Sequence, residues 1–189
     1  MTIPNILTLL RLILIPVFVS QLYYGQFGWA LSTFFLAGLS DAIDGFIARR
    51  FNQTSEIGKA LDPIADKLMM TTAFVVLSLP QIVPRSTYLP IPFWLTAAVI
   101  ARDVLIIVVA GAIFVTTNFR NFRPSIWGKI STSIQVLSVL LILIAVNYPF
   151  FGELYLPIVY FMVFSLAAIS GFHYIFFVSF LMKREKQSI

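Results

Sequence analysis

Long apolar runs separated by short polar stretches make up most of this 189-residue chain. A helix that crosses the hydrocarbon of a bilayer needs about 20 mostly apolar residues. Glycine, proline and polar residues mark the connections, for example at Asn52 to Gly58 and at Pro80 to Pro92. The pattern predicts six helical spans, which cover residues 5–24, 28–49, 62–80, 91–117, 125–147 and 154–182.

Composition favours a membrane protein. Hydrophobic residues make up 59% of the chain and charged residues 11%, whereas about a quarter of the residues of a soluble domain are charged. We therefore expect an all-α integral membrane protein with a single domain over residues 1–189. The absence of cysteine excludes thiolate metal sites and leaves carboxylates as the plentiful hard ligands for a cation.

The distribution of positive charge predicts the topology. The formal net charge is +5, but long apolar runs separate the basic residues, so anionic lipids are better partners for them than nucleic acid. The first 20 residues lack the features of a removable signal peptide. With both termini in the cytoplasm, only Arg85 lies outside, as the positive-inside rule requires. The cytoplasmic basic residues are then Arg49, Arg50, Lys59, Arg120, Arg123, Lys129, Lys183, Arg184 and Lys186.

Four aspartates lie at the predicted cytoplasmic side of the second and third spans. Asp41 and Asp44 share one helical face, and Asp62 and Asp66 share a face of the next helix. An aspartate deep in a span costs about 2.5–3.5 kcal/mol, so four of them need a counter-ion or a water-filled cavity. Their oxygens suit Mg²⁺ or Mn²⁺. A structural alternative is that Asp62, followed by Pro63, caps a helix, and that Asp66 interacts with the helix dipole.

The spacing of these residues reads DxxDGxxAR, then eight residues, then GxxxDxxxD. This resembles the signature of the CDP-alcohol phosphotransferase family, with every position matched. The resemblance implies a membrane enzyme that displaces CMP from a CDP-linked substrate, usually CDP-diacylglycerol, with an alcohol as nucleophile. It also implies two divalent metal ions, Mg²⁺ or Mn²⁺, and a homodimer.

The same resemblance implies roles for individual residues. Asp41, Asp44 and Asp62 would hold the metal ions, and Asp66 would act as the base and also contact a metal. The CDP group would be bound by Asp41, Gly45, Ala48, Arg49 and Gly58, together with Asn5 and Thr8 near the start of the chain. Gly45 has an alternative role in helix packing, and Gly58 has one in a turn.

Basic residues are candidates for binding a phosphate of the acceptor or of a lipid. The set comprises Arg11, Arg102, Arg120, Arg123 and Lys129. Two alternatives remain open: Arg11 could extend to the interface, and Arg102 could be neutralised by Asp103.

The acceptor is suggested by local sequence. The opening Ile3-Pro4-Asn5 with Arg11 resembles both phosphatidylglycerol phosphate synthases and CMP-forming cardiolipin synthases. Asp103 and Val109 depart from the Glu and Arg of the former enzymes. The acceptor implied is therefore phosphatidylglycerol, as in cardiolipin synthases, with glycerol 3-phosphate as the alternative.

Other classes of membrane protein also carry intramembrane aspartates. An ion-coupled transporter could line its pathway with Asp41, Asp44 and Arg102, but no repeat or pair of broken helices is visible. Membrane prenyltransferases bind Mg²⁺-diphosphate through aspartates with a different spacing. The enzyme interpretation places the protein in the inner (cell) membrane of a bacterium, with its active site facing the cytoplasm.

Overall fold

The computed structural model describes the backbone of residues 3–51, 56–116 and 126–186. Side chains are described mainly over residues 8–41, 63–109 and 126–176. This part of the chain is helical, apart from its connections and an isolated bridge between Ser86 and Leu89.

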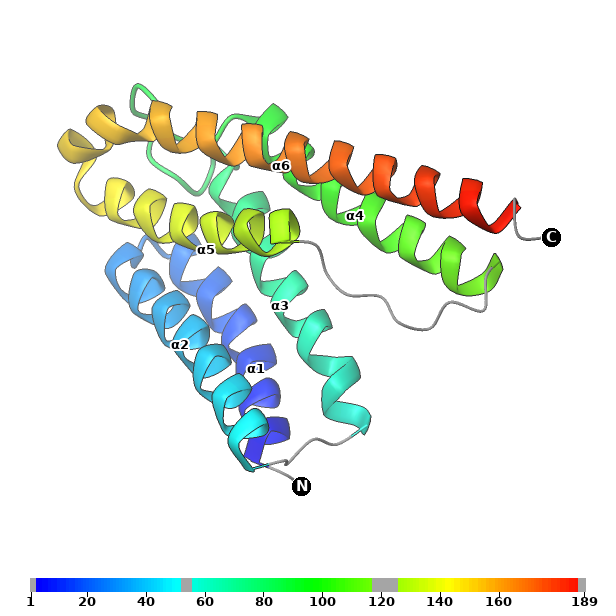
Figure 1. Cartoon of the computed structure of the whole chain (residues 1–189). Helices are drawn as coiled ribbons and strands as arrows, with labels where there is room; N and C mark the ends of the chain where they lie inside the picture. The colour runs from blue at the N-terminus through cyan, green and yellow to red at the C-terminus, as the bar shows by residue number, and fades with distance from the viewer. Residues whose placement is uncertain (1–2, 52–55, 117–125, 187–189) are drawn as a thin grey trace. The chain divides into compact units, whose positions relative to one another are not determined.

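Within the described residues, six helices follow one another (Figure 1). They confirm the six predicted helices, whose ends lay within a few residues of those observed, apart from the starts of α3 and α6. Their bounds are α1 (Ile3–Tyr23), α2 (Phe27–Phe51), α3 (Glu56–Leu77), α4 (Phe93–Thr116), α5 (Ile126–Asn147) and α6 (Pro149–Lys186).

The start of α3 differs from the prediction. The helix begins at Glu56, so Asp62 lies in its second turn and does not cap it. Pro63 lies inside the helix, where its ring removes one backbone hydrogen bond. The preceding residues Lys59, Ala60 and Leu61 favour helix, which explains why α3 extends beyond the proline. Gly58 is likewise helical instead of lying in a turn.

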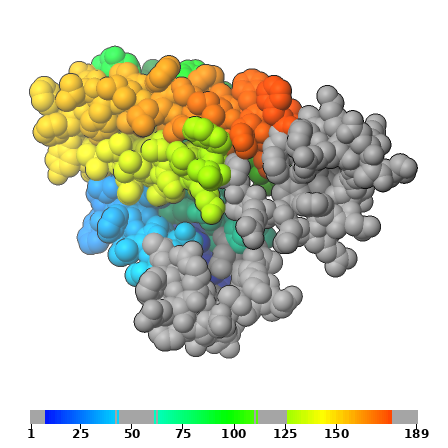
Figure 2. Space-filling model, in the orientation of Figure 1, coloured from blue at the N-terminus to red at the C-terminus, as the bar shows by residue number. Residues whose placement is uncertain are grey.

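Within the described residues, two helical stretches are long and apolar enough to cross a membrane. They are Ile126–Asn147 and Pro149–Phe176, with mean hydropathies of 2.1 and 1.9, and Thr8–Tyr23 is a shorter apolar helix. Among residues 149–176 of α6, most exposed side chains are apolar, and these residues are drawn in yellow-orange to orange in Figure 2. These features indicate a membrane protein, while the number of spans remains a prediction.

The chain divides into two compact units. The first contains residues 1–92 and 136–156, and the second contains residues 93–135 and 157–189. Helices α5 and α6 each contribute to both units. A single domain over residues 1–189 stays a prediction.

In the first unit, α2 and α3 both pack against α1 (Figure 1). Phe18 and Phe34 meet with their ring centroids 5.7 Å apart, and Leu22 is fully buried. The turn between α1 and α2 uses Gly25 with φ of +71°, a conformation that costs glycine little and other residues more. This turn makes α1 and α2 antiparallel neighbours.

Close backbone contact joins α5 to the start of α6 in the first unit. A Cβ added to Gly152 would lie 2.7 Å from the Ala145 Cβ, so only glycine fits without a shift. The Tyr155 hydroxyl donates a hydrogen bond of 2.8 Å to the Leu141 carbonyl. These contacts stabilise the turn between α5 and α6.

Candidate active site

The buried faces of α1, α2 and α3 each change from apolar to charged residues at the same end of the first unit. Asp41 continues the face of α2 that buries Phe34 and Ala37. Asp66 precedes Met69 and Met70 on the buried face of α3. Arg11 lies on the face of α1 that buries Phe18. The spacings are those of one helical face, so the same packing that forms the core brings three charged side chains together.

A cavity of about 70 Å³ lies at this junction. Its size suits an ion with a few water molecules, because a water in the liquid occupies about 30 Å³. The two carboxylates and the guanidinium give it a polar part, and apolar residues of three helices form the rest. The lining consists of Arg11, Phe34, Ala37, Gly38, Asp41, Asp66, Met69, Met70 and Val136.

Arg11 makes an ion pair with Asp41, with Nη2 and Oδ1 2.7 Å apart. The arginine side chain is only 2% exposed, whereas that of the aspartate is 49% exposed. Arg11 therefore does not extend to the interface, and the anion that it contacts belongs to the aspartate motif. An uncompensated buried charge costs about 3–5 kcal/mol, so this pair constrains both α1 and α2.

The donor set fits a divalent metal ion of the hard type. Asp41 and Asp66 supply carboxylate oxygens to one cavity, and Mg²⁺ and Mn²⁺ prefer such ligands. The backbone places Asp44 three residues after Asp41 on α2, and Asp62 four residues before Asp66 on α3. Their side chains lie outside the described residues, and the described part of the chain contains no group of three or more potential metal ligands.

The other residues predicted to bind CDP are placed only in part. Thr8 is fully buried on α1, one turn before Arg11. The remaining five residues belong to helices, and their side chains lie outside the described set. These are Asn5 on α1, Gly45, Ala48 and Arg49 on α2, and Gly58 on α3.

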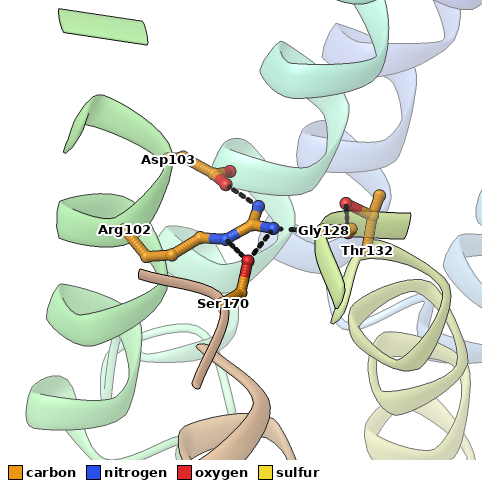
Figure 3. A network of polar contacts seen from close by, with 5 residues as sticks. All are labelled: Arg102, Asp103, Gly128, Thr132 and Ser170. Carbon is orange, nitrogen blue, oxygen red and sulfur yellow. Dashed lines mark hydrogen bonds and ion pairs between the residues drawn. The ribbon is translucent and has the colours of Figure 1, made fainter. Parts of the chain in front are cut away.

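In the second unit, Arg102 joins three helices (Figure 3). Its Nη1 contacts Asp103 Oδ1 at 2.7 Å. Its Nη2 donates to Ser170 Oγ on α6 at 2.8 Å and to the Gly128 carbonyl on α5 at 3.3 Å, and its Nε donates to Ser170 Oγ at 3.2 Å. Arg102 and Asp103 are both buried. Each guanidinium nitrogen thus has a partner inside the protein.

This network agrees with the alternative in which Asp103 neutralises Arg102, and the acceptor-binding role of Arg102 stays a prediction. Arg102 also borders an apolar groove of about 230 Å³ between α4 and α6. Lys129 is exposed on α5 and could bind an anion directly. Arg120 and Arg123 lie outside the described residues.

Several buried polar residues were not assigned a role from the sequence. Ser170 accepts hydrogen bonds from Arg102, although the two residues lie 68 positions apart in the sequence. No sequence pattern indicates such a pairing. On α5, Ser131, Gln135 and Ser138 are each 1% exposed. Their spacing of four and three residues places them on one helical face, and this spacing in an apolar helix could have revealed a buried polar stripe.

The sequence matches the model of the CDP-alcohol phosphatidyltransferase family over residues 1–172. The chain belongs to this family. It is therefore a phosphatidyltransferase of phospholipid synthesis, and this favours the enzyme over a transporter or a purely structural membrane protein. Enzymes of the family use divalent metal ions, in keeping with the carboxylates at the cavity.

Relatives that are named for different activities match this chain. A CDP-diacylglycerol--glycerol-3-phosphate 3-phosphatidyltransferase of Blochmanniella floridana is 38% identical over 152 residues, which cover 77% of this chain and 75% of the relative. A similarly named protein of Pseudomonas fluorescens is 34% identical over 151 residues, covering 76% and 72%. The human cardiolipin synthase (CMP-forming) is 34% identical over 192 residues, which cover 92% of this chain but 61% of the relative. The names leave the acceptor alcohol open.

The Arg102 network predicts graded losses of stability. Asp103→Asn would leave a buried guanidinium without its counter-charge and lower the free energy of unfolding by about 3–5 kcal/mol. Ser170→Ala would remove hydrogen bonds to a charged group and cost about 1.5–3 kcal/mol. Ser32→Ala is the control, because the Ser32 hydroxyl is exposed and bonds only within α2. Thermal unfolding in detergent measures all three, and an Asp103 variant as stable as the control would contradict the structural role of this pair.

Proposed function

We propose that this protein transfers the phosphatidyl group of CDP-diacylglycerol to the terminal hydroxyl of phosphatidylglycerol, forming cardiolipin and CMP. The observation that carries the catalytic part is the meeting of Arg11, Asp41 and Asp66 at one cavity. Family membership supports the reaction class. The choice of acceptor rests on local sequence features.

Asp41, Asp44 and Asp62 are the proposed metal ligands. They would hold one or two divalent ions, which would offset the negative charge of the pyrophosphate and of the leaving oxygen. These residues belong to α2 and α3, which both pack against α1. The apolar residues Phe34, Met69 and Met70 limit the cavity on its buried side.

Asp66 is the proposed general base. The acceptor hydroxyl attacks the phosphorus that carries the diacylglycerol, its proton passes to an Asp66 carboxylate oxygen, and the bond from this phosphorus to the CMP oxygen breaks. A positioned carboxylate contributes about 10²–10⁴ in rate in such proton transfers. Asp66 borders the cavity and is only partly buried, so a substrate hydroxyl can reach it.

Residues on both sides of the aspartates are proposed to bind the nucleotide. Gly45, Ala48 and Gly58 have little or no side chain, which allows a nucleotide close to the helix backbone. Arg49 would contact phosphate, and Asn5 and Thr8 would contribute from α1.

The proposal of phosphatidylglycerol as acceptor rests on Asp103 and Val109, which depart from the pattern of phosphatidylglycerol phosphate synthases. Arg102 directs its hydrogen bonds to protein atoms, which leaves Arg120, Arg123 and Lys129 as proposed contacts for the acceptor. Glycerol 3-phosphate remains the second candidate, since the Blochmanniella relative is named for that acceptor.

We further propose that all six helices span the inner membrane of a bacterium, with both termini and the active site at the cytoplasmic side. The positive-inside rule supports this orientation. Helix α6 has 38 residues and is about 57 Å long, so it exceeds a hydrocarbon thickness of about 30 Å. The homodimer implied by the family resemblance stays a prediction.

The topology can be tested by cysteine labelling, because the chain has no native cysteine. In right-side-out vesicles, an impermeant maleimide is expected to label Gln26→Cys and Arg85→Cys. It is expected to label Gln53→Cys and Asn121→Cys only after the membrane is opened. Labelling of Gln53→Cys in closed vesicles would contradict the proposed orientation.

The reaction can be tested by CMP release from purified protein supplied with CDP-diacylglycerol and Mg²⁺ or Mn²⁺. Phosphatidylglycerol and glycerol 3-phosphate are offered separately, and the lipid product is identified. We expect cardiolipin from the former and little product from the latter. Phosphatidylglycerol phosphate formed from glycerol 3-phosphate alone would replace the proposed acceptor, and no CMP with either would count against both.

The aspartate roles predict separable defects. Asp41→Asn and Asp62→Asn are expected to abolish turnover, because each removes a proposed ligand. Asp66→Asn is expected to lower turnover about 100-fold or more with a smaller effect on binding of CDP-diacylglycerol. Glu153→Gln is the control, since its exposed carboxylate contacts Thr87 away from the cavity. An unchanged rate in Asp66→Asn would remove this residue from the role of base.

A further inference from the structure

The ion pair between Arg11 and Asp41 is unequal in its exposure to solvent. The Arg11 side chain is 2% exposed, whereas the Asp41 side chain is 49% exposed and borders the cavity. The cation is thus enclosed in the core of the first unit, and the anion faces the space in which a ligand would bind. The contact joins Nη2 to Oδ1 at 2.7 Å, within the range of a charge-assisted hydrogen bond.

Arginine keeps its charge in proteins, so the buried Arg11 needs an anion whether or not a metal ion is present. Asp41 supplies this anion. Asp66 borders the same cavity, and two carboxylates facing one space repel each other unless a cation lies near them. Among the described residues that line the cavity, Arg11 provides the positive charge. The arginine therefore offsets the charge of the carboxylates that a metal ion would otherwise neutralise.

A divalent ion in the cavity would also meet the Arg11 charge. Two cations near the same carboxylate repel each other, and the repulsion is stronger inside a protein than in water. The affinity for the ion then reflects attraction by the aspartates minus repulsion by the arginine. Arg11 also occupies one oxygen of Asp41, which leaves fewer lone pairs for the ion.

We propose that Arg11 is a positioning residue of the metal site and acts as a counter-cation. Its positive charge stabilises the carboxylates when no ion is bound, and it lowers their affinity for the divalent ion. This inference rests on the proposed function, because it takes Asp41 as a ligand of the ion. It differs from the role in binding an acceptor or lipid phosphate that the sequence suggested for Arg11. Such a role would require the guanidinium to face the substrate, whereas the structure encloses it and directs it at Asp41.

The test measures Mn²⁺ binding to the substrate-free, full-length protein in detergent by titration calorimetry. Arg11→Met removes the charge while keeping a long apolar side chain, and Arg11→Lys keeps the charge. We expect Arg11→Met to bind Mn²⁺ about tenfold more tightly than the unmodified protein, which corresponds to about 1.4 kcal/mol. Arg11→Lys is expected to retain an affinity close to that of the unmodified protein.

Arg102→Met is the matched control. Arg102 is also buried and also pairs with an aspartate at 2.7 Å, but it lies in the second unit and does not line this cavity. Its loss is expected to lower stability without changing Mn²⁺ affinity. Tighter Mn²⁺ binding in Arg102→Met as well would reveal a general effect of net charge and would overturn the inference.

Thermal unfolding supplies a second readout. In the presence of a chelator, Arg11→Met is expected to unfold at a lower temperature than the unmodified protein, and excess Mn²⁺ is expected to raise its unfolding temperature by a larger increment. A purely structural role for Arg11 would give the same Mn²⁺ increment in both proteins. If Arg11→Met does not fold, Arg11→Gln replaces it, because glutamine keeps a neutral donor for Asp41.

The outcomes separate this inference from the proposed function. Mn²⁺ binding by the unmodified protein with equal or weaker binding by the folded Arg11 variant would overturn only the role of Arg11. No Mn²⁺ binding by the unmodified protein would overturn both that role and the proposed metal site. Tighter Mn²⁺ binding by Arg11→Met, together with unchanged Mn²⁺ affinity in Arg11→Lys, would support the role of Arg11 as a counter-cation.

Discussion

Charges inside an apolar helical bundle must be balanced within it, and this constraint accounts for the main polar features of the structure. Arg11 and Arg102 are both buried, and each contacts an aspartate at 2.7 Å. Each pair also has a direct structural consequence. The first connects α1 to α2, and the second belongs to a network that connects α4 to α5 and α6. The same electrostatic requirement thus organises both units of the chain.

The two arginines differ in what surrounds them. The side-chain partners of Arg102, Asp103 and Ser170, are buried, and the hydrogen bonds of its guanidinium form an internal network. The partner of Arg11 is half exposed and borders a cavity with a second carboxylate, that of Asp66. A closed network stabilises the fold, whereas an open one retains oxygen atoms that can bind a ligand. This difference, and not the presence of intramembrane charge itself, distinguishes the candidate active site from a structural ion pair.

Hydropathy and the turn residues between the apolar runs were sufficient to predict the six helices, since both are local signals. The aspartate spacing predicted the family for the same reason. The start of α3 was predicted wrongly, because Pro63 was taken as a helix start, although a helix can continue through a proline. The pairings of Arg11 with Asp41 and of Arg102 with Ser170 could not be predicted, since they depend on how distant segments pack and no local pattern specifies them.

The two units carry different parts of the proposed chemistry. The four aspartates and the predicted CDP-binding residues belong to the first 66 residues, in the first unit, whereas Arg102, Arg120, Arg123 and Lys129 belong to the second. If these four basic residues contact the acceptor as proposed, changes within residues 93–135 would alter which alcohol is accepted while the residues proposed for the displacement step stay intact. Attempts to change acceptor specificity would then be directed to the second unit.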